Sequence, residues 1–406
     1  MDARIATPFW DFYQNDDDFK ERAEFKGFIN HEFEGKSLKS SIYKIWSQNQ
    51  KVAQYLIKPD PEYAKLFDIG ESVKIYDDLP QSPSHTRALF LTTAFPATAA
   101  LYRGKKQQKK FDILHYHPWT VGLLSNSIKD YYNPIKKLLG QPPVHVVQHF
   151  HSSSFEEQGF FPLNTYNSLG IRVPISKEIV DIQQESLLNL DMVIHVSNAL
   201  AEKAVDPKRG GVFLNAFQNL KKQGRLVGVI NGINHASFDI TNKNTYKEFA
   251  IEQKIEVSEG KNIDSTDYIL KKGEMKKTLF KEGIIADPEK PLFVFVDRFA
   301  YDKGIDVLLA MVKQIAKEGG QAVVMGCSSW LPPEIQMLQE YANNNPSILK
   351  VYITLKDQQT PLKNSSVSNG FAIRLASNFF LIPSNNESCG LVGLEGLAAG
   401  SILITS

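Results

Sequence analysis

The feature that most constrains this chain is a recurring run of four or five apolar residues, each followed by a segment with helical spacing. Strands that are apolar at successive positions, rather than at alternate ones, are buried on both faces, as in parallel sheets covered by helices. The alternation therefore predicts an α/β fold with parallel sheets. The strands expected on this basis are 111–115, 144–148, 192–196, 226–230, 292–296, 322–325, 351–354 and 379–382.

The length and one polar stretch predict two domains. A chain of 406 residues exceeds what one hydrophobic core usually serves, because single cores stop growing at roughly 250–300 residues. The pattern of strands and helices lapses between Thr241 and Lys290, a stretch rich in lysine, glutamate and asparagine. We expect two Rossmann-like, doubly wound domains over 1–240 and 291–406, with the interdomain crossing over 241–290.

The clearest unit follows that crossing. The strand in PLFVFVDR leads to Gly304 and then to an apolar stripe at helical spacing over 305–316, which Gly319 and Gly320 end. The strand AVVMG and a helix over about 332–341 come next. In doubly wound sheets ligands bind beyond the carboxyl ends of the strands, so the loops at those ends are the expected site.

Charge, hydropathy and cysteine content exclude several classes of protein. Lysine plus arginine number 46 and aspartate plus glutamate 45, so no global field attracts nucleic acid. No apolar run approaches the roughly 20 residues of a membrane span, and Met1 to Trp10 lacks the features of a signal peptide. Two cysteines, Cys327 and Cys389, are too few for a disulfide framework or a structural zinc site. We expect a cytoplasmic protein.

The segment SNNESCGLVGLEGLAAG carries the first candidate site. It follows the strand NFFLIPS, and Gly390 with Leu391 would open a helix there. A helix start aims unpaired N–H groups and a partial positive charge at its ligand, which suits a sugar pyrophosphate. Glu387 can accept hydrogen bonds from sugar hydroxyls, and Glu395, two turns further on, can reach a ribose. The alternative is a capped helix with Glu395 on a solvated face.

The segment VDRFAYDKG carries the second. Arg298 ends a strand, and Lys303 lies just before the next helix, so both cations belong to the carboxyl end of a parallel strand. A leaving nucleoside diphosphate develops negative charge, which two fixed cations can stabilise without a metal. The alternative is a surface ion pair of Lys303 with Asp302 or Asp306.

Together these segments resemble two signatures of the starch and glycogen synthases. The first signature is "GR, four residues, KG", seen here from Asp297 to Gly304, and the second is "PS, two residues, EPCGL", seen here as PSNNESCGL. Glu395 is typical of the wider set of retaining GT-B glycosyltransferases. The N-terminal half contains further segments that resemble those of the family, in the same order along the chain. Its similar segments are SHTRALFLTTAF, HYHPWTVGLL (family HxHDWHxGL), VVQHFHS (family TxHN), VIHVSNALAEKAV and VINGINHASFD (family LNGIDxxxWxP).

The resemblance implies a GT-B fold, with two domains facing a cleft, and a retaining transfer of a hexose from a nucleoside-diphosphate sugar to a hydroxyl of a glycan or another acceptor. It implies that Arg298 and Lys303 hold the phosphates, that Glu387 binds the transferred sugar and that Glu395 holds the ribose. His151 best matches the active-site histidine, with His149 as the competing choice. The other residues expected to contact the donor are Asn231, Gly326, Cys389, Gly390 and Leu391.

No cofactor other than the donor, and no metal, is expected for this transfer. The acidic run NDDDF contains an Asp-x-Asp but lacks a preceding apolar strand, so we interpret it as a polar turn or a helix start. Two alternatives for the function stay open. One keeps the fold and uses another donor, such as GDP-mannose, on a protein, lipid or small glycan. The other is a non-catalytic GT-B domain that binds a nucleotide or glycan within a larger protein.

Departures from the family pattern concern the acceptor and the sugar rather than the phosphate cations. Asp297 replaces a glycine, Pro118 and Thr120 replace an aspartate and a histidine, Ser388 replaces a proline, and Asn234 replaces the aspartate of NGID. No KxGGL-type loop precedes ATPFW, and SILITS ends on an apolar strand. On these grounds we expect a chain truncated at both ends.

Overall fold

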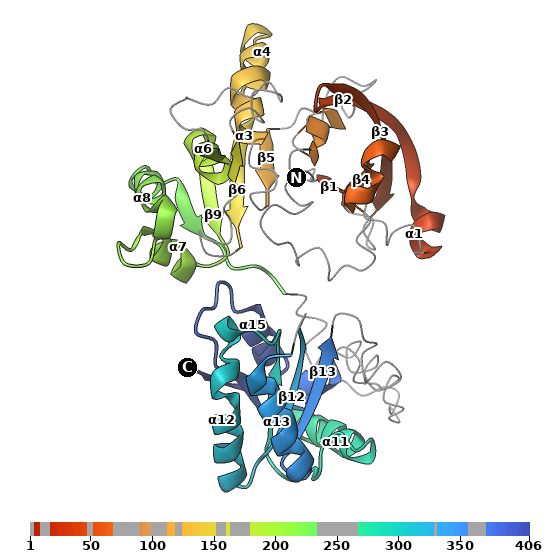
Figure 1. The fold of residues 1–406 in the computed structure, drawn as a ribbon, viewed down its shortest axis with the longest axis vertical. Coiled ribbons are helices and arrows are strands. Elements are labelled where there is room, and N and C mark those ends of the chain that lie inside the picture. Colours follow the sequence, from red (N-terminus) through yellow and green to blue (C-terminus); the bar gives the residue numbers. More distant parts are fainter. Residues whose placement is uncertain are drawn as a thin grey trace. The chain divides into compact units, whose positions relative to one another are not determined.

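The computed structural model divides the chain into two compact units, Met1–Ile230 and Asn231–Ser406, which are drawn in Figure 1. Each unit is described by itself. The structure describes residues 4–8, 17–46, 52–67, 90–91, 93–95, 97–98, 112–117, 124–151, 160–162, 179–233, 267–328, 331–355 and 371–406.

A parallel sheet forms one half of the first unit. Its strand order is β10-β9-β6-β5, and all three pairings are parallel. The four predicted strands are therefore confirmed, with ends that differ by a few residues. The strands are β5 (Ile113–Tyr116), β6 (His145–Phe150), β9 (Met192–His195) and β10 (Leu226–Gly228). The main described helices of this half are α4 (Asn133–Leu138), α6 (Ile182–Asn189), α7 (Asn198–Val205) and α8 (Leu214–Lys222).

A second sheet in this unit was not predicted from the sequence. Its order is β1-β4-β3-β2, and its longest strands form an antiparallel hairpin. On β2 only alternate residues are buried, among them Ile29, His31 and Phe33, because the other face of an antiparallel sheet can meet solvent. Glu34 and Gly35 both take positive φ at the turn, as hairpin turns of the primed type require. The strands are β1 (Arg4–Pro8), β2 (Glu24–Phe33), β3 (Lys36–Trp46) and β4 (Ala53–Lys58).

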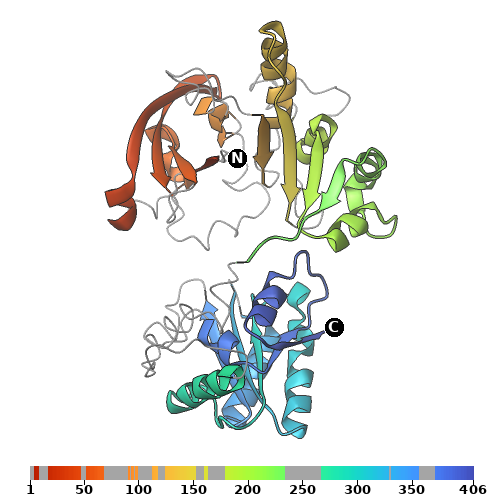
Figure 2. The same ribbon diagram turned by 180° about the vertical axis from the view of Figure 1, so that it is seen from behind.

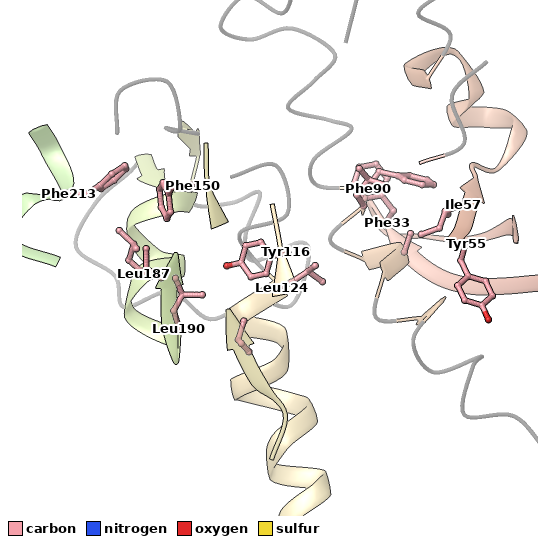
Figure 3. Close-up of a cluster of buried hydrophobic side chains, with 14 of the residues drawn as sticks. Phe33, Tyr55, Ile57, Phe90, Tyr116, Leu124, Phe150, Leu187, Leu190 and Phe213 are labelled. Carbon is pink, nitrogen blue, oxygen red and sulfur yellow. The ribbon is translucent and has the colours of Figure 1, made fainter. Parts of the chain in front are cut away.

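One hydrophobic cluster joins the two sheets of the first unit. Figure 3 shows Phe33 and Phe90 from one part of it, and Tyr116 and Phe150 from the other. The acidic run also takes the predicted form, because α1 (Asp17–Arg22) begins within it. None of the described helices combines the length and apolar character that crossing a bilayer requires.

The core of the first unit contains a buried histidine that makes its stability sensitive to pH. His195 is 2% exposed and contacts the rings of Phe150 and Phe217. Neither ring nitrogen has a hydrogen-bond partner among the described residues. Burial lowers the pKa of His195 to about 4, against roughly 6.5 in an unfolded chain.

Between those two pKa values the unfolded chain binds the extra proton, so stability falls as the pH drops from about 7 toward 4, by up to about 3 kcal/mol. We expect His195→Leu to remove the part of this dependence that His195 contributes, up to about 3 kcal/mol, while the other histidines whose pKa is lowered keep theirs. Urea unfolding at pH values from about 7.5 down to about 4.5, in a buffer with chelator, measures it. An unchanged slope in His195→Leu would contradict the assignment.

The second unit is a five-stranded parallel sheet in the order β13-β12-β11-β14-β15. Neighbouring residues of β11 face opposite layers: Val294 and Val296 belong to one core cluster and Phe295 to another. The predicted burial on both faces is thus confirmed. The strands are β11 (Leu292–Val296), β12 (Gln321–Ser328), β13 (Leu349–Leu355), β14 (Phe379–Ile382) and β15 (Ile402–Thr405).

Helices cover both faces of this sheet, as Figures 1 and 2 show. The helices are α11 (Asp267–Lys281), α12 (Ile305–Lys317), α13 (Pro333–Asn344), α14 (Phe371–Ala376) and α15 (Leu391–Ala398). The two helices predicted after 304 and after 331 are confirmed, and Gly319, at φ 78°, follows the end of the first. The crossing expected over 241–290 contains α11, whose Met275 and Leu279 are fully buried in the core of the second unit.

Candidate active site

The loops that follow β11 and β14 lie side by side. These two strands are paired in the sheet, with Phe293 opposite Phe379, so the segments beyond their carboxyl ends meet. The backbone N–H of Asn385 donates to the carbonyl oxygen of Asp302 at 2.9 Å, and its side-chain amide donates to that of Tyr301 at 3.2 Å. The structure therefore joins the two sequence motifs into one surface.

Gly304 makes this junction possible. It has φ 71°, a left-handed conformation that glycine adopts without strain. A Cβ atom at this position would lie 2.0 Å from the carbonyl oxygen of Pro383, so any side chain would push the second loop away. The glycine of VDRFAYDKG is therefore required both by its own backbone angle and by the approach of the neighbouring loop.

Lys303 and Glu387 meet at the centre of this surface. The ammonium nitrogen of Lys303 lies 2.9 and 3.2 Å from the two carboxylate oxygens of Glu387, and 3.5 Å from Oδ2 of Asp297. The Lys303 side chain is 11% exposed. Its burial favours a lower pKa, but Asp297 and Glu387 outweigh burial and raise the pKa of Lys303. The lysine is thus held as a fixed cation, as phosphate binding requires.

Asp297 departs from the family glycine, and the structure shows what it does. Its side chain is 12% exposed, and its Oδ1 accepts a hydrogen bond from the backbone N–H of Arg298 at 2.7 Å. Burial raises the pKa of Asp297, and Lys303 opposes that rise. The carboxylate therefore contacts the same lysine that the sequence assigns to the donor phosphates.

Arg298 lies on the same loop with its side chain in solvent. The side chain is 66% exposed, and its nearest described ion-pair partner is Asp302, with Nη2 and Oδ2 3.7 Å apart. An exposed pair of this kind contributes little to stability. Arg298 is therefore placed to reach a ligand that enters from solvent, whereas Lys303 lies at the base of the loop.

Glu395 pairs with an arginine that the sequence analysis did not single out. Oε2 of Glu395 lies 3.1 Å from Nε of Arg374, and both side chains are largely buried. Burial lowers the pKa of Arg374, while Glu395 and Asp297 act to raise it. Arg374 thus lies within the electrostatic reach of both acids. The sequence signal that could have identified Arg374 is a single arginine in the otherwise apolar run FAIRLA.

The structure shows where the small residues that the sequence predicts to contact the donor lie. Gly326 allows β12 to approach the Asp297 loop, because a Cβ atom there would lie 2.3 Å from the Asp297 carbonyl oxygen. Gly390, at φ 72°, precedes α15, and Leu391 is the first residue of that helix. Cys389, just before them, is a free thiol. Their contacts with a donor remain predictions.

The predicted histidine belongs to the first unit. His151 follows β6, and its Nε2 lies 2.7 Å from Nδ1 of His117. The competing residue, His149, is 7% exposed and stacks against both of them. Burial lowers the pKa of His151, so it is neutral at pH 7. Asn231 is the first residue of the second unit and is partly buried.

Three of the five departures lie outside the described residues: Pro118, Thr120 and Asn234. Ser388 is described and lies in the loop between Glu387 and α15. Lys303 contacts both Glu387 and Asp297, and Arg298 lies on the same loop as Lys303. Glu395 pairs with Arg374, whose pKa Asp297 also influences. This alternation of acids and bases can hold a ligand that carries both phosphates and hydroxyl groups.

The chain matches two protein families, and together the matches cover most of its length. Residues 1–219 match the family described as "Starch synthase catalytic domain". Residues 276–406 match "Glycosyl transferases group 1". The second match contains the loops that carry Lys303 and Glu387.

Several curated relatives are glycogen synthases. The chain is 26% identical to the glycogen synthase of Actinobacillus pleuropneumoniae over 294 residues, which are 72% of this chain and 55% of that protein. It is 23% identical to the glycogen synthase of Protochlamydia amoebophila over 391 residues, or 92% of this chain and 70% of that protein. The chain thus spans little more than half the length of the first of these relatives.

A solved structure confirms the fold class. The catalytic domain of starch synthase IV from Arabidopsis thaliana, bound to ADP and acarbose, superimposes with a TM-score of 0.74 at 22% identity, over 99% of this chain and 75% of that one. The two Rossmann-like α/β units are therefore those of a GT-B glycosyltransferase fold. With the family match over more than half of its length, the chain belongs to the starch synthase catalytic domain family.

Proposed function

We propose that the protein transfers a hexose from a nucleoside-diphosphate sugar to a hydroxyl of a glycan, with retention at the anomeric carbon, as a glycogen or starch synthase does. The observation that carries this proposal is the contact between Lys303 and Glu387, which joins the two loops at neighbouring strand ends. A cation for the leaving diphosphate and a carboxylate for sugar hydroxyls then lie within one hydrogen bond of each other.

The proposed roles follow from burial and charge. Lys303, fixed by two carboxylates, and Arg298, exposed on the same loop, supply positive charge where the nucleoside diphosphate leaves. A charge that is already oriented stabilises a transition state without reorganisation. Glu387 accepts from the sugar hydroxyls. Glu395, oriented by Arg374, accepts from the ribose.

The remaining assignments rest on the sequence signatures. His151 is proposed as the active-site histidine because of the TxHN-like segment, and Asn231 is proposed near the reacting sugar. Gly390 and Leu391 open α15 toward the proposed diphosphate. We place the reaction in the cytoplasm, a reducing setting that suits a chain with only two cysteines, Cys327 and Cys389.

A donor screen tests the proposal. The chain is incubated with ADP-glucose, UDP-glucose or GDP-mannose and a soluble α-glucan, and release of the nucleoside diphosphate and growth of the glucan are followed. We expect ADP-glucose to be used, because the solved starch synthase is bound to ADP. Use of GDP-mannose alone would contradict the glycogen-synthase-like assignment. Turnover with none of the three would favour the alternative of a binding domain.

A further inference from the structure

Four histidines gather on one face of the first unit's parallel sheet. They come from HYH at the end of β5 and HFH at the end of β6, and strand residues two apart point to the same face. The strands are paired with Tyr116 opposite Gln148, so the next residues, His117 and His149, lie opposite each other. The ring centroids are 4.9 Å apart for His115 and His117, and 5.1 Å apart for His117 and His149.

Three of these rings present nitrogens close enough to share an ion. One ring nitrogen each from His115, His117 and His149 lies within 4.8 Å of the other two. In a tetrahedral site with Zn–N bonds of about 2.0–2.1 Å, such nitrogens are about 3.4 Å apart. The separations therefore need to close by about 1.4 Å at most. Rotation of the side chains about χ1 and χ2 can supply this shift without moving the strands.

His149 gives an independent indication of a ligand. It is 7% exposed, yet both its ring nitrogens are buried without a hydrogen-bond partner among the described residues. Leaving a buried polar group unsatisfied costs about 1–3 kcal/mol, so native structures rarely keep one without a reason. A bound metal ion would satisfy the nitrogen that acts as its ligand.

His151 has a different place in the cluster. Its Nε2 lies 2.7 Å from Nδ1 of His117, a hydrogen-bond distance that leaves no room for an ion between the two atoms. This contact leaves the other nitrogen of His117, Nε2, for a metal. Metal-ligating histidines commonly donate their second N–H to a neighbouring acceptor, which fixes the tautomer and the ring orientation. His151 fits that supporting position.

We propose that His115, His117 and His149 form a binding site for a divalent transition-metal ion of the Zn²⁺ type, with His151 orienting His117. Imidazole nitrogens suit zinc, copper and nickel, whereas Mg²⁺ and Ca²⁺ require oxygen ligands. Three imidazoles leave a fourth coordination position open, as in zinc sites that bind water or substrate. His115 and His117 are exposed, which gives the ion a path from solvent.

The protonation states agree with this site. Burial, with a contribution from the neighbouring rings, lowers the pKa of His149 to about 4. The lowered pKa favours neutral imidazole, which is the form that binds a metal. The site includes His151, the proposed active-site histidine, and His149, its competitor, but it goes beyond the transfer reaction proposed above, for which the sequence motifs predicted no metal.

Metal titration of the chain, prepared without a histidine tag and stripped with chelator, tests the proposal. The probes are Co²⁺, followed by its visible absorption, and Zn²⁺, followed by calorimetry and by displacement of Co²⁺. We expect one ion per chain, with an absorption intensity typical of four-coordinate Co²⁺ that Zn²⁺ abolishes. Absence of saturable binding of either ion would overturn the proposal.

Matched variants locate the site. We expect His115→Gln and His149→Gln each to weaken Zn²⁺ binding more than tenfold, and His151→Asn to weaken it about tenfold, as loss of an orienting partner does. His145→Gln is the control, because His145 is exposed at the opposite end of β6, and it should bind Zn²⁺ like the unchanged chain. Equal loss in His145→Gln, or full binding in His115→Gln, would overturn the assignment.

Two checks keep this result separate from folding and from donor binding. His115 is exposed, so His115→Gln should keep the circular dichroism spectrum and the melting temperature of the metal-free chain, and its loss of Zn²⁺ binding then reports the site alone. ADP binding, measured in chelator, reports the loops of the second unit. Zn²⁺ binding without ADP binding would support the metal site while contradicting the donor site, and the reverse would contradict only the metal site.

Discussion

Replacing Arg298 by alanine is expected to lower kcat/KM for the sugar nucleotide by about 10²–10³-fold, the loss typical of a single electrostatic contact to a transition state. The melting temperature should stay unchanged, because the side chain is 66% exposed and its described ion pair with Asp302 is 3.7 Å long. Steady-state kinetics with the donor found in the screen, beside a thermal melt, measures both quantities.

Lys317→Ala is the matched control for Arg298→Ala. Lys317 is an exposed cation in the last turn of α12, away from the strand-end loops, so its removal should leave the kinetics unchanged. If Arg298→Ala unfolds at a lower temperature by as much as it loses activity, the residue is structural. Retention of full kcat/KM would remove it from the site.

Lys303 is a less clear test of catalysis than Arg298. Its removal would leave Asp297 and Glu387 facing each other in a largely buried setting, and breaking a buried pair is destabilising by roughly 3–5 kcal/mol. An inactive Lys303→Ala chain would therefore combine lost chemistry with a loosened loop. Arg298 is the clearer test, because its side chain is exposed and its removal breaks no buried pair.

A large loss of stability is also expected for Gly304→Ala. The left-handed conformation costs an alanine about 1–2 kcal/mol, and a Cβ atom 2.0 Å from the Pro383 carbonyl oxygen must displace the neighbouring loop, which typically costs a further 1–3 kcal/mol or so. We expect the free energy of unfolding of the second unit to fall by roughly 2–5 kcal/mol in total. Urea unfolding followed by circular dichroism measures it.

Gly319 supplies the control for that change. It has a similar positive φ of 78°, but a Cβ atom there would meet nothing within 4 Å. Gly319→Ala should therefore cost only the backbone strain, about 1–2 kcal/mol. The difference between the two variants isolates the contact with Pro383. Equal destabilisation by both would show that the two loops do not depend on this close approach.

The sequence predicted the parallel sheets because a strand buried on both faces must be apolar at successive positions. Leu292–Val296 and Phe379–Ile382 were found with their exact bounds for this reason. The antiparallel sheet of the first unit was missed for the same reason. Its strands Glu24–Phe33 and Lys36–Trp46 bury one face only and carry polar residues on the other, so they contain no continuous apolar run.

The chemistry-bearing residues were visible in the sequence, but their partners were not. Lys303 and Glu387 could be named from two motifs that lie 84 positions apart. The ion pair of Glu395 with Arg374 could not, because it depends on how α14 and α15 pack against each other. The histidine cluster likewise depends on the register of β5 against β6, which determines which side chains lie next to each other.

The sequence by itself determined the classes of element and the loops that hold charge, since hydrophobic spacing and glycine positions act locally along the chain. Only the tertiary structure decided which charges touch. Strand order and register bring distant residues together, and burial then shifts their pKa values, so the Lys303–Glu387 contact and the lowered pKa of His149 exist only once the sheets have formed.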